Sequence, residues 1–343
     1  MITEKEINEI RTLLKKSRSP LFLYDDDPDG LSSFLLLRKW LGRGKGIVVK
    51  SSPTLDTKYI KKVEELKPDR VFVLDKPIIA QEFVDEARVP VVWIDHHDLV
   101  NVEGVKYFNP KINNKEDYRP TSYWCSIVSD NHDWIAAAGI IGDWHIPDNL
   151  DELIEKYPDL FFKTKNPGDL LFNSEFGILI KIFSFALKGT TTQIRNNVAI
   201  LLKTESPYEI LNKLTPAGKY LYKHFERVNK EYSELLEKAV KKYDPKTNSL
   251  IFTYPSTRSS HTGALSNELI YKFPDTLLVI GRIKGDEVRI SLRHSSKVIP
   301  PVLEKALEGL EGYGGGHLHA CGANIKEADF KEFVDRLKRL IQK

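Results

Sequence analysis

Four aspartates crowd one short segment, YDDDPDG, which follows an apolar stretch and precedes a helical one. They are Asp25, Asp26, Asp27 and Asp29. Carboxylates a few ångströms apart repel each other, so such a cluster is more typical of a site for a hard cation than of a simple turn. A turn with a helix N-cap would explain one or two of these aspartates but explains four poorly. The segment therefore predicts a metal site built from oxygen ligands.

Other apolar stretches also end in acids or histidines. RVFVLD ends at Asp75, and VPVVWID ends at Asp95, which is followed by His96 and His97. Asp143 ends the apolar segment AAAGIIGD, where a buried carboxylate without a cation or strong donors would be costly. A mixed set of carboxylates and imidazoles suits Mn²⁺ or Mg²⁺ better than a structural zinc site, which normally uses thiolates.

A glycine-rich segment near the C-terminus, GYGGGHLHACG, is the second candidate site. Consecutive glycines let backbone N–H groups approach an anion closely, and a nearby histidine or arginine can add charge-assisted hydrogen bonds. A flexible turn without a ligand is the alternative. The predicted substrate-binding residues are Gly314, Gly315, Gly316, His317, His319 and, at the end of a predicted strand, Arg293.

The elements that must position the first group of residues alternate between strands and helices. Apolar, β-branched runs predict strands over residues 20–24, 46–51, 70–75 and 89–95, and helical periodicity predicts helices over 31–41, 59–67 and 78–87. This order is typical of βαβ units with a parallel sheet, and the almost wholly apolar strands predict helices on both faces. In such sheets ligands bind outside the carboxyl ends of the strands, where the predicted metal ligands lie.

Beyond the predicted sheet, residues 118–130 and 131–144 have the pattern of buried helices, and residues 225–248 have that of a charged connecting helix. Strands are predicted over 249–255, 276–283 and 287–294, with helices over 263–273 and 303–310, a glycine-rich turn over 312–325 and a C-terminal amphipathic helix. We therefore predict an α/β catalytic domain over residues 1–215, a helical linker over 216–248 and a smaller α+β domain over 249–343.

Length and composition agree with two domains. The chain has 343 residues, whereas single cores usually stop growing near ~250 residues. The net charge of +3 does not by itself indicate a nucleic-acid binder. Two cysteines, Cys125 and Cys321, give no disulfide framework, and a charged N-terminal segment does not look like a signal peptide. With no apolar run near ~18 residues, we expect a cytoplasmic protein that has no contact with a membrane.

Taken in order, these motifs resemble those of the DHH phosphoesterase superfamily with its C-terminal DHH-associated domain, in the branch of RecJ-like exonucleases and nanoRNases. The resemblance rests on DDDPDG, on LD at Asp75, on DHH at Asp95, on GD at Asp143 and on GGGHLHACG. It implies two divalent cations, with Mn²⁺ preferred and Mg²⁺ as the alternative. One departure concerns Asp25, because many relatives have histidine at this position, which leaves occupancy of the first cation position open.

The resemblance also implies roles for single residues. Asp25 and Asp27 would hold one cation, with Asp75 bridging the pair. Asp29, His96 and Asp143 would hold the other cation. His97 would face the scissile phosphate, and Asp95 would orient the neighbouring histidines. In the C-terminal domain, Arg293 and the loop from Gly314 to His317 would bind a phosphate or nucleotide.

The function implied is an exonuclease that releases mononucleotides from single-stranded DNA or RNA or from short oligonucleotides. Replication or repair proteins are the expected partners. Two alternatives remain open at this stage: a cyclic or linear dinucleotide phosphodiesterase, and a catalytically inactive RecJ-like scaffold of a replication or repair complex.

Overall fold

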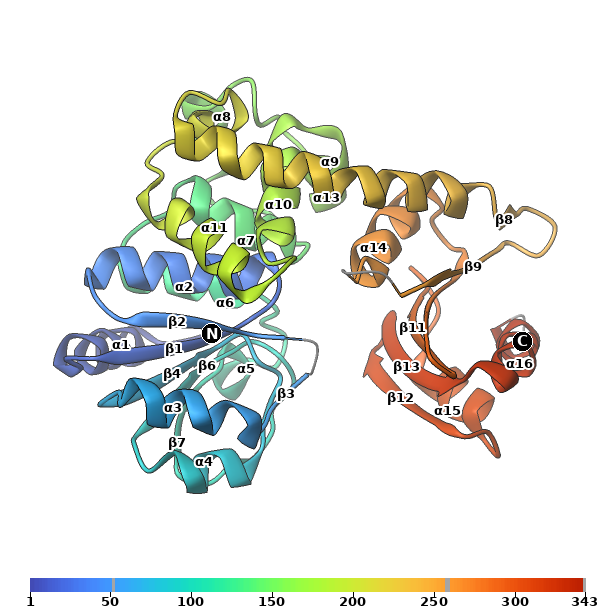
Figure 1. Ribbon diagram of the computed structural model, residues 1–343, viewed down its shortest axis with the longest axis horizontal. Helices are drawn as coiled ribbons and strands as arrows, with labels where there is room; N and C mark the ends of the chain where they lie inside the picture. Colours follow the sequence, from blue (N-terminus) through green and yellow to red (C-terminus); the bar gives the residue numbers. More distant parts are fainter. Residues whose placement is uncertain (51–52, 257–259, 342–343) are drawn as a thin grey trace. The chain divides into compact units, whose positions relative to one another are not determined.

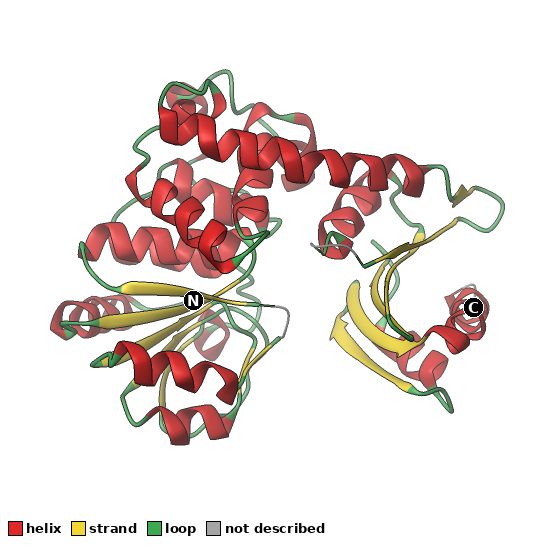
Figure 2. Ribbon diagram, viewed as in Figure 1, coloured by secondary structure: helices red, strands yellow, loops and turns green. Residues whose placement is uncertain are grey.

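A five-stranded parallel sheet organises the N-terminal part of the chain (Figures 1 and 2). In spatial order its strands are β2 (Lys45–Val49), β1 (Pro20–Asp25), β4 (Arg70–Leu74), β6 (Val91–Ile94) and β7 (Val105–Phe108). Every neighbouring pair is parallel, which confirms the predicted α/β fold. The sequence did not predict β7, because its four residues form only a short, partly exposed apolar pattern.

The computed structural model describes residues 1–50, 53–256 and 260–341. Ser51, the last residue of the strand predicted over 46–51, lies outside these ranges. The chain divides into two compact units, Met1–Phe225 and Glu226–Lys343. The boundary between the units falls inside a long charged helix, α13 (Pro216–Val240). The domain limits at residues 215 and 248 remain predictions.

Helices cover both faces of the parallel sheet, as predicted. In Figure 1, α2 and α6 lie on one face, and α3 and α4 lie on the other. The elements of the first unit outside its main sheet are α1 (Glu4–Lys16), α2 (Pro28–Leu41), β3 (Thr54–Leu55), η1 (Thr57–Tyr59), α3 (Ile60–Leu66), β5 (Ile78–Ile79), α4 (Gln81–Ala87), α5 (Pro110–Asn113), α6 (Thr121–Ser129), α7 (Trp134–Gly142), α8 (Leu150–Lys156), α9 (Pro167–Asn173), α10 (Glu175–Ala186), α11 (Thr191–Lys203) and α12 (Pro207–Leu211).

The helix predicted over residues 78–87 is shorter than expected. Ile78 and Ile79 pair with β3 as strand β5, and only Gln81–Ala87 form the helix α4. The two isoleucines are β-branched, so their apolar spacing is compatible with either element, and the strand partner in β3 decided between them.

Alternate residues of the sheet build the core beneath α3 and α4. Leu21 and Leu23 of β1, Val73 of β4 and Trp93 of β6 belong to one buried cluster, to which Phe83 of α4 also contributes. This two-residue period is that of a pleated strand, in which every second side chain faces the same layer. This packing fixes the register of the strands and therefore the positions of their carboxyl ends.

A mixed six-stranded sheet forms the second unit, in the order β12-β13-β11-β10-β9-β8. Only β9 and β10 pair in parallel, and the other neighbours are antiparallel. The elements are β8 (Tyr243–Asp244), β9 (Ser249–Pro255), α14 (Thr262–Lys272), β10 (Leu277–Lys284), β11 (Glu287–Arg293), α15 (Pro300–Leu307), β12 (Gly312–His317), β13 (Ala320–Lys326), η2 (Glu327–Asp329) and α16 (Phe330–Ile341).

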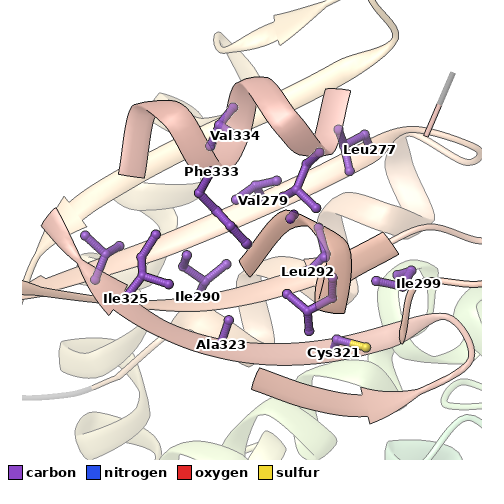
Figure 3. Packing of buried hydrophobic residues seen from close by; sticks show 14 residues of the cluster. Leu277, Val279, Ile290, Leu292, Ile299, Cys321, Ala323, Ile325, Phe333 and Val334 are labelled. Carbon is purple, nitrogen blue, oxygen red and sulfur yellow. The ribbon is translucent and has the colours of Figure 1, made fainter. Parts of the chain in front are cut away.

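One face of this second sheet carries its hydrophobic core. Val279, Ile290 and Ile325 of the strands pack with Phe333 of α16 (Figure 3). Leu303 of α15 belongs to the same buried cluster. The core gives the smaller unit a buried layer of its own, as the predicted α+β domain requires.

The glycine-rich segment is not a turn, contrary to the prediction. Gly312–His317 form β12 and Ala320–Lys326 form β13, so only Leu318 and His319 lie in the turn between them. Glycine suits these strands because a Cβ at Gly312 would lie 2.6 Å from the carbonyl oxygen of Asn324, and one at Gly314 would lie 2.8 Å from that of Gly322. Close approach of two backbones, rather than a bend, therefore accounts for these glycines.

Within the described ranges, none of the helices combines the length and apolar character needed to cross a membrane.

Candidate metal centre

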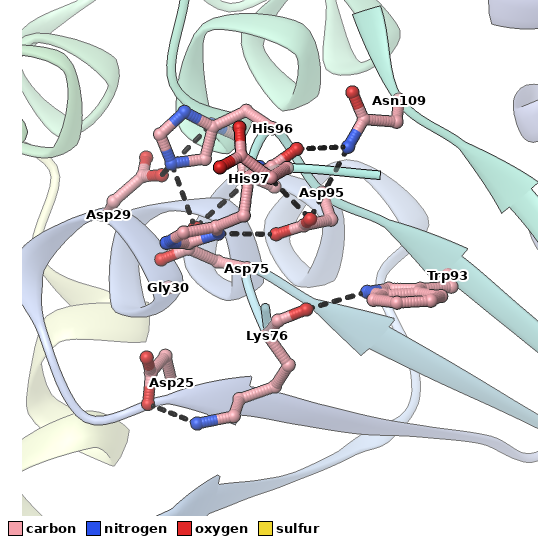
Figure 4. Close-up of polar contacts among 12 residues, drawn as sticks. Asp25, Asp29, Gly30, Asp75, Lys76, Trp93, Asp95, His96, His97 and Asn109 are labelled. Atoms are coloured by element: carbon pink, nitrogen blue, oxygen red, sulfur yellow. Dashed lines mark hydrogen bonds and ion pairs between the residues drawn. The ribbon is translucent and has the colours of Figure 1, made fainter. Parts of the chain in front are cut away.

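The predicted metal ligands meet at the carboxyl ends of three neighbouring strands. Asp25 ends β1, Asp75 follows β4 and the Asp95-His96-His97 segment follows β6. Because β1, β4 and β6 are adjacent and parallel, these residues lie at one edge of the sheet (Figure 4). Asp143 joins them as the residue that ends α7.

The start of α2 positions two further aspartates. Asp27 is the N-cap of α2, and its Oδ1 accepts the N–H of Gly30 at 2.9 Å. Asp29 lies in the first turn and is buried, with 1% of its surface exposed. Its two oxygens accept the N–H groups of Thr121 at 2.9 Å and Ser122 at 2.7 Å, which begin α6. Asp29 is thus fixed by the N-termini of two helices, which favour a negative charge.

Three overlapping groups of ligand atoms result. In each group the donor atoms lie within 4.8 Å of one another, a spacing that suits a metal ion. The groups are Asp25, Asp27 and Asp75; Asp29, His96 and Asp143; and Asp75, His96 and His97. All six residues predicted as metal ligands are therefore brought together, and Asp75 and His96 each belong to two groups.

His96 lies at the centre of the second group. Its Nε2 is 3.5 Å from Asp75 Oδ1, 3.5 Å from Asp143 Oδ2 and 3.9 Å from Asp29 Oδ2. Burial, together with the nearby charge of His97, lowers the pKa of His96. A neutral imidazole is the form that can bind a cation, so this shift favours a role as a ligand.

Asp95 holds His97 in place. Its Oδ1 lies 2.7 Å from His97 Nδ1, and its Oδ2 accepts the backbone N–H of His97 at 3.0 Å. Burial lowers the pKa of His97, but the hydrogen bond to Asp95 and the charge of that carboxylate outweigh it and raise the pKa to about 9. At neutral pH His97 is therefore a cation whose orientation is set by the fully buried Asp95.

The electrostatics of the site fit divalent cations. Burial is the largest cause that raises the pKa of Asp27, Asp75 and Asp143 well above the ordinary value, and repulsion from neighbouring aspartates adds to it. A cluster of hard oxygen donors with this much unbalanced negative charge, joined by imidazoles, suits Mn²⁺ or Mg²⁺. The donor set therefore fits the predicted pair of cations.

Asp75 also has an unusual backbone. Its φ is +59°, in the left-handed region that residues other than glycine seldom adopt. Its side chain is 2% exposed and accepts a hydrogen bond of 3.1 Å from Thr121 Oγ1. Strained backbone of this kind persists only where the surrounding structure enforces it, and it is common at functional sites.

Two polar residues of the site were not predicted from the sequence. Lys76 is completely buried, and its Nζ forms an ion pair of 2.8 Å with Asp25 Oδ1 (Figure 4). Asn109 follows β7 and donates from Nδ2 to the carbonyl oxygen of His97 at 2.9 Å. Lys76 directly follows Asp75, so the rule that identified Asp75 could also have found it. Asn109 follows β7, a strand that the sequence did not predict, so the same rule could not have found it.

The predicted substrate-binding residues belong to the second unit. Arg293 of β11 pairs with Ala320 of β13, which in turn pairs with His317 of β12, so the ends of these three strands lie in one row. Burial lowers the pKa of Arg293 to about 10, and its Nη1 donates to the carbonyl oxygen of Leu292 at 3.1 Å. The side chain of His317 lies outside the described part of the structure.

Gly315, Gly316 and His319 differ in how much open space surrounds them. A Cβ at Gly315 would meet nothing within 4 Å, so this glycine faces open space. Gly316 has a φ of +149°, and a Cβ there would lie 2.4 Å from the carbonyl oxygen of Ala320. His319 is exposed, and its Nδ1 lies 2.9 Å from the carbonyl oxygen of Lys297. The segment therefore presents accessible backbone next to the strand end that carries Arg293.

One family model matches the C-terminal part of the chain. Residues 247–343 match the DHHA1 domain family. A comparison with curated protein sequences finds no significant match.

Solved structures show the fold of the whole chain. RecJ from Thermus thermophilus in complex with Mn²⁺ aligns with a TM-score of 0.71 at 16% identity, covering 99% of this chain and 55% of that one. The chain thus spans about half the length of that RecJ. An exonuclease RecJ bound to manganese aligns with a TM-score of 0.65 at 14% identity, covering 99% of this chain and 94% of that one.

A protein that is shorter than the Thermus RecJ has the same fold. A pGpG-specific phosphodiesterase from Vibrio cholerae aligns with a TM-score of 0.53 at 15% identity, covering 95% of this chain and 99% of that one. The chain therefore has a DHHA1 domain over residues 247–343, carries the sequence DHH at Asp95 and has the fold of RecJ over 99% of its length.

Proposed function

We propose that the protein is a two-metal phosphodiesterase that works as an exonuclease on single-stranded nucleic acid or short oligonucleotides and releases mononucleotides. The observation that carries the proposal is the sharing of ligands: Asp75 and His96 each belong to two of the three ligand groups. Asp75 and His96 meet in the third group and so link the other two, which supports two neighbouring cation positions of the kind that two-metal phosphoryl chemistry requires. Bound divalent cations would activate a water molecule and neutralise charge on the phosphoryl oxygens.

The ligand groups support a division of roles. Asp25 and Asp27 would hold the first cation, with Asp75 as the bridging residue. Asp29, His96 and Asp143 would hold the second. Asp27 and Asp29 are held through their contacts with helix N-termini, so their oxygens are positioned before a cation arrives.

His97 would act directly on the substrate. Its Nδ1 is engaged by Asp95, and its Nε2 would donate a hydrogen bond to an oxygen of the scissile phosphate. The protonated ring would stabilise negative charge that develops there. Asp95 would serve as a positioning residue that keeps the ring protonated and oriented.

The second unit would bind the end of the substrate. Arg293 would contribute a positive charge, and Gly314, Gly315 and Gly316 would allow a phosphate or base to approach the backbone of β12 closely. His317 and His319 would complete this binding site. Trp144, which follows Asp143 and is 36% exposed, could stack on a base near the metal centre.

A cyclic or linear dinucleotide phosphodiesterase is the second candidate. The observation in its favour is the fold that 95% of this chain shares with the pGpG-specific phosphodiesterase.

The deciding experiment incubates the purified protein and Mn²⁺ with single strands of DNA and RNA of 2 to 20 nucleotides, labelled at either the 5′ or the 3′ end. Stepwise shortening of the longer strands would support the exonuclease and give its polarity. Cleavage restricted to dinucleotides would favour the second candidate.

The control for this assay is Asp75→Ala, which should remove turnover while leaving the circular dichroism spectrum unchanged. If neither Mn²⁺ nor Mg²⁺ gave turnover of any substrate, the proposal would be wrong and an inactive scaffold would replace it. Replication or repair proteins as partners and a location in the cytoplasm are further parts of the proposal, and pull-down and fractionation experiments test them.

A further inference from the structure

A pocket of about 440 Å³ lies along the free edge of the parallel sheet, in the first unit. β2 is the edge strand and, among the residues that the structure describes, pairs only with β1. Arg38 of α2 and Arg195 of α11 line the pocket from one face of the sheet, and Tyr59 and Lys62 line it from the other. This volume falls within the range of small-molecule binding sites.

The described lining of the pocket is basic and includes no acidic residue. Its five cations are Arg38, Lys50, Lys58, Lys62 and Arg195. Lys58 and Lys62 form ion pairs with Asp56 and Glu65 at their exposed ends. Lys50 and Arg195, in contrast, form no ion pair with any residue that the structure describes. Both remain available for an anionic ligand.

The floor of the pocket is aromatic and apolar. Tyr24 and Phe34 are buried and stack with ring centroids 4.7 Å apart and planes at 4°. Gly46 of β2 lets the strand pass over this pair, because a Cβ there would lie 2.4 Å from the Phe34 ring. Val198 of α11 adds an aliphatic wall. A flat, apolar group would fit against such a surface.

The backbone around the pocket offers further polar contacts. Because β2 has a strand partner on one side only, its outer N–H and C=O groups face the pocket edge. Thr191, in the first turn of α11, also lines the pocket, and the N-terminus of this 13-residue helix favours an anion. A ligand here would meet hydrogen-bonding groups beside an apolar surface and several cations.

We infer that this pocket binds a nucleoside monophosphate at a site separate from the metal centre, with the base on the apolar floor and the phosphate at Arg195 and Lys50. A fatty acid would use the floor but carries a single charge, which leaves most of the cations and the free edge of β2 unused. Inorganic phosphate would use the cations but not the floor. The inference concerns binding only and does not depend on the proposed phosphodiesterase activity.

The test is isothermal titration calorimetry with the full chain in EDTA, so that metal-dependent binding and turnover do not contribute. The probes are AMP, GMP, CMP, UMP, inorganic phosphate and octanoate. We expect saturable binding of at least one nucleoside monophosphate with one site in this pocket, and at least tenfold weaker binding of phosphate and octanoate.

Two variants on α11 locate the site. Arg195→Glu reverses a charge in the pocket, and Ala199→Trp fills part of its volume, and both positions are exposed and should tolerate the change. Each should weaken nucleotide binding at least tenfold. Lys203→Glu makes the same charge change on the same helix outside the pocket and should leave the affinity within twofold.

Several outcomes would overturn the inference. Binding that survives both Arg195→Glu and Ala199→Trp would place the nucleotide elsewhere, for example on the glycine-rich strands of the second unit. If Lys203→Glu weakened nucleotide binding as much as Arg195→Glu, the cause would be unspecific attraction to a basic helix. Octanoate that binds more tightly than every nucleotide would identify an apolar anion as the ligand. Loss of nucleotide binding in Asp75→Ala would contradict a site that is independent of the metal centre. Unchanged nucleotide binding in this variant would support such a site.

Discussion

At the scale of single residues, Asp75 connects the parts of the metal centre. It is buried, has left-handed backbone and belongs to two ligand groups. Its pKa is raised well above the usual value, first by burial and then by repulsion from Asp29 and Asp27. The position therefore reduces the stability of the metal-free protein, a common property of residues that are arranged for function rather than for folding.

We expect Asp75→Asn to separate the contribution of this carboxylate to turnover from its effect on the stability of the metal-free protein. The amide keeps the shape of the side chain but removes a negative charge, so metal-dependent turnover should fall at least ~100-fold. In EDTA, the free energy of unfolding should rise, because the amide removes a buried carboxylate that is repelled by Asp29 and Asp27. Activity assays and urea unfolding measure the two effects.

The surface variant Asp151→Asn, at a side chain that is 74% exposed, is the control for Asp75→Asn and should change neither quantity appreciably. A stable Asp75→Asn protein with more than a few per cent of the original turnover would rule out the bridging role of Asp75.

Lys76 offers a second test at this scale. Its buried ammonium pairs with Asp25, so replacement by Met should leave that carboxylate without its partner and lower the stability of the metal-free protein by about 3 kcal/mol. The same change removes a cation that competes for Asp25 Oδ1, so Mn²⁺ should bind more tightly. Urea unfolding in EDTA and titration with Mn²⁺ test both points, and weaker Mn²⁺ binding in a folded Lys76→Met protein would contradict this account.

At the scale of elements, three helices converge on the metal centre. α2 carries Asp29, α6 holds that carboxylate through its first N–H groups, and α7 ends at Asp143. Gly139 of α7 lets the three helices approach, because a Cβ there would lie 2.6 Å from Ser122 Cβ and 2.7 Å from Ser32 Cβ. The distance between Asp29 and Asp143 therefore depends on close packing at Gly139, whose neighbour Ser122 also donates to Asp29.

Gly139→Ala should force these helices apart. We expect a loss of roughly 1–3 kcal/mol in the free energy of unfolding, as overpacked cores show, together with lower turnover. The matched control is Gly263→Ala in α14, where a Cβ would meet nothing within 4 Å and where alanine should stabilise the helix by about 0.5–1 kcal/mol. Thermal unfolding of both variants measures these changes. If Gly139→Ala and Gly263→Ala changed the stability of the protein equally, the close packing at Gly139 would be contradicted.

At the scale of the whole molecule, the metal centre should couple stability to pH. In the metal-free folded state, burial and repulsion raise the pKa values of Asp27, Asp75 and Asp143, and Asp95 raises that of His97 to about 9. The folded chain therefore retains protons that the unfolded chain releases. Under this condition the free energy of unfolding falls as the pH rises.

We expect the metal-free protein to be less stable at pH 8.5 than at pH 7. Because cations must displace the retained protons, Mn²⁺ should bind more tightly at pH 8.5 and stabilise the protein more there. Urea unfolding with EDTA and with Mn²⁺ at both pH values measures this difference. A metal-free protein that gained stability between pH 7 and pH 8.5 would show that these groups are not buried together.

The sequence by itself determined the kinds of ligand and the elements that carry them. Apolar strands that end in Asp25, Asp75 and Asp95 specify a parallel sheet with acids at one edge, because strand period and strand ends are local properties of the chain. The order of the motifs also predicted the C-terminal domain that the DHHA1 match confirms. These features depend on neighbouring residues, so they can be read without knowledge of the tertiary structure.

Only the tertiary structure decided how distant residues meet. The contacts of Asp29 with Thr121 and Ser122 and the ion pair between Lys76 and Asp25 join residues that are 51 or more positions apart. The pairing of β12 with β13 likewise turned a predicted glycine-rich turn into two strands. The basic pocket beside β2 combines α2, α3 and α11, whose approach follows from packing on the sheet, and no local pattern in the sequence encodes it.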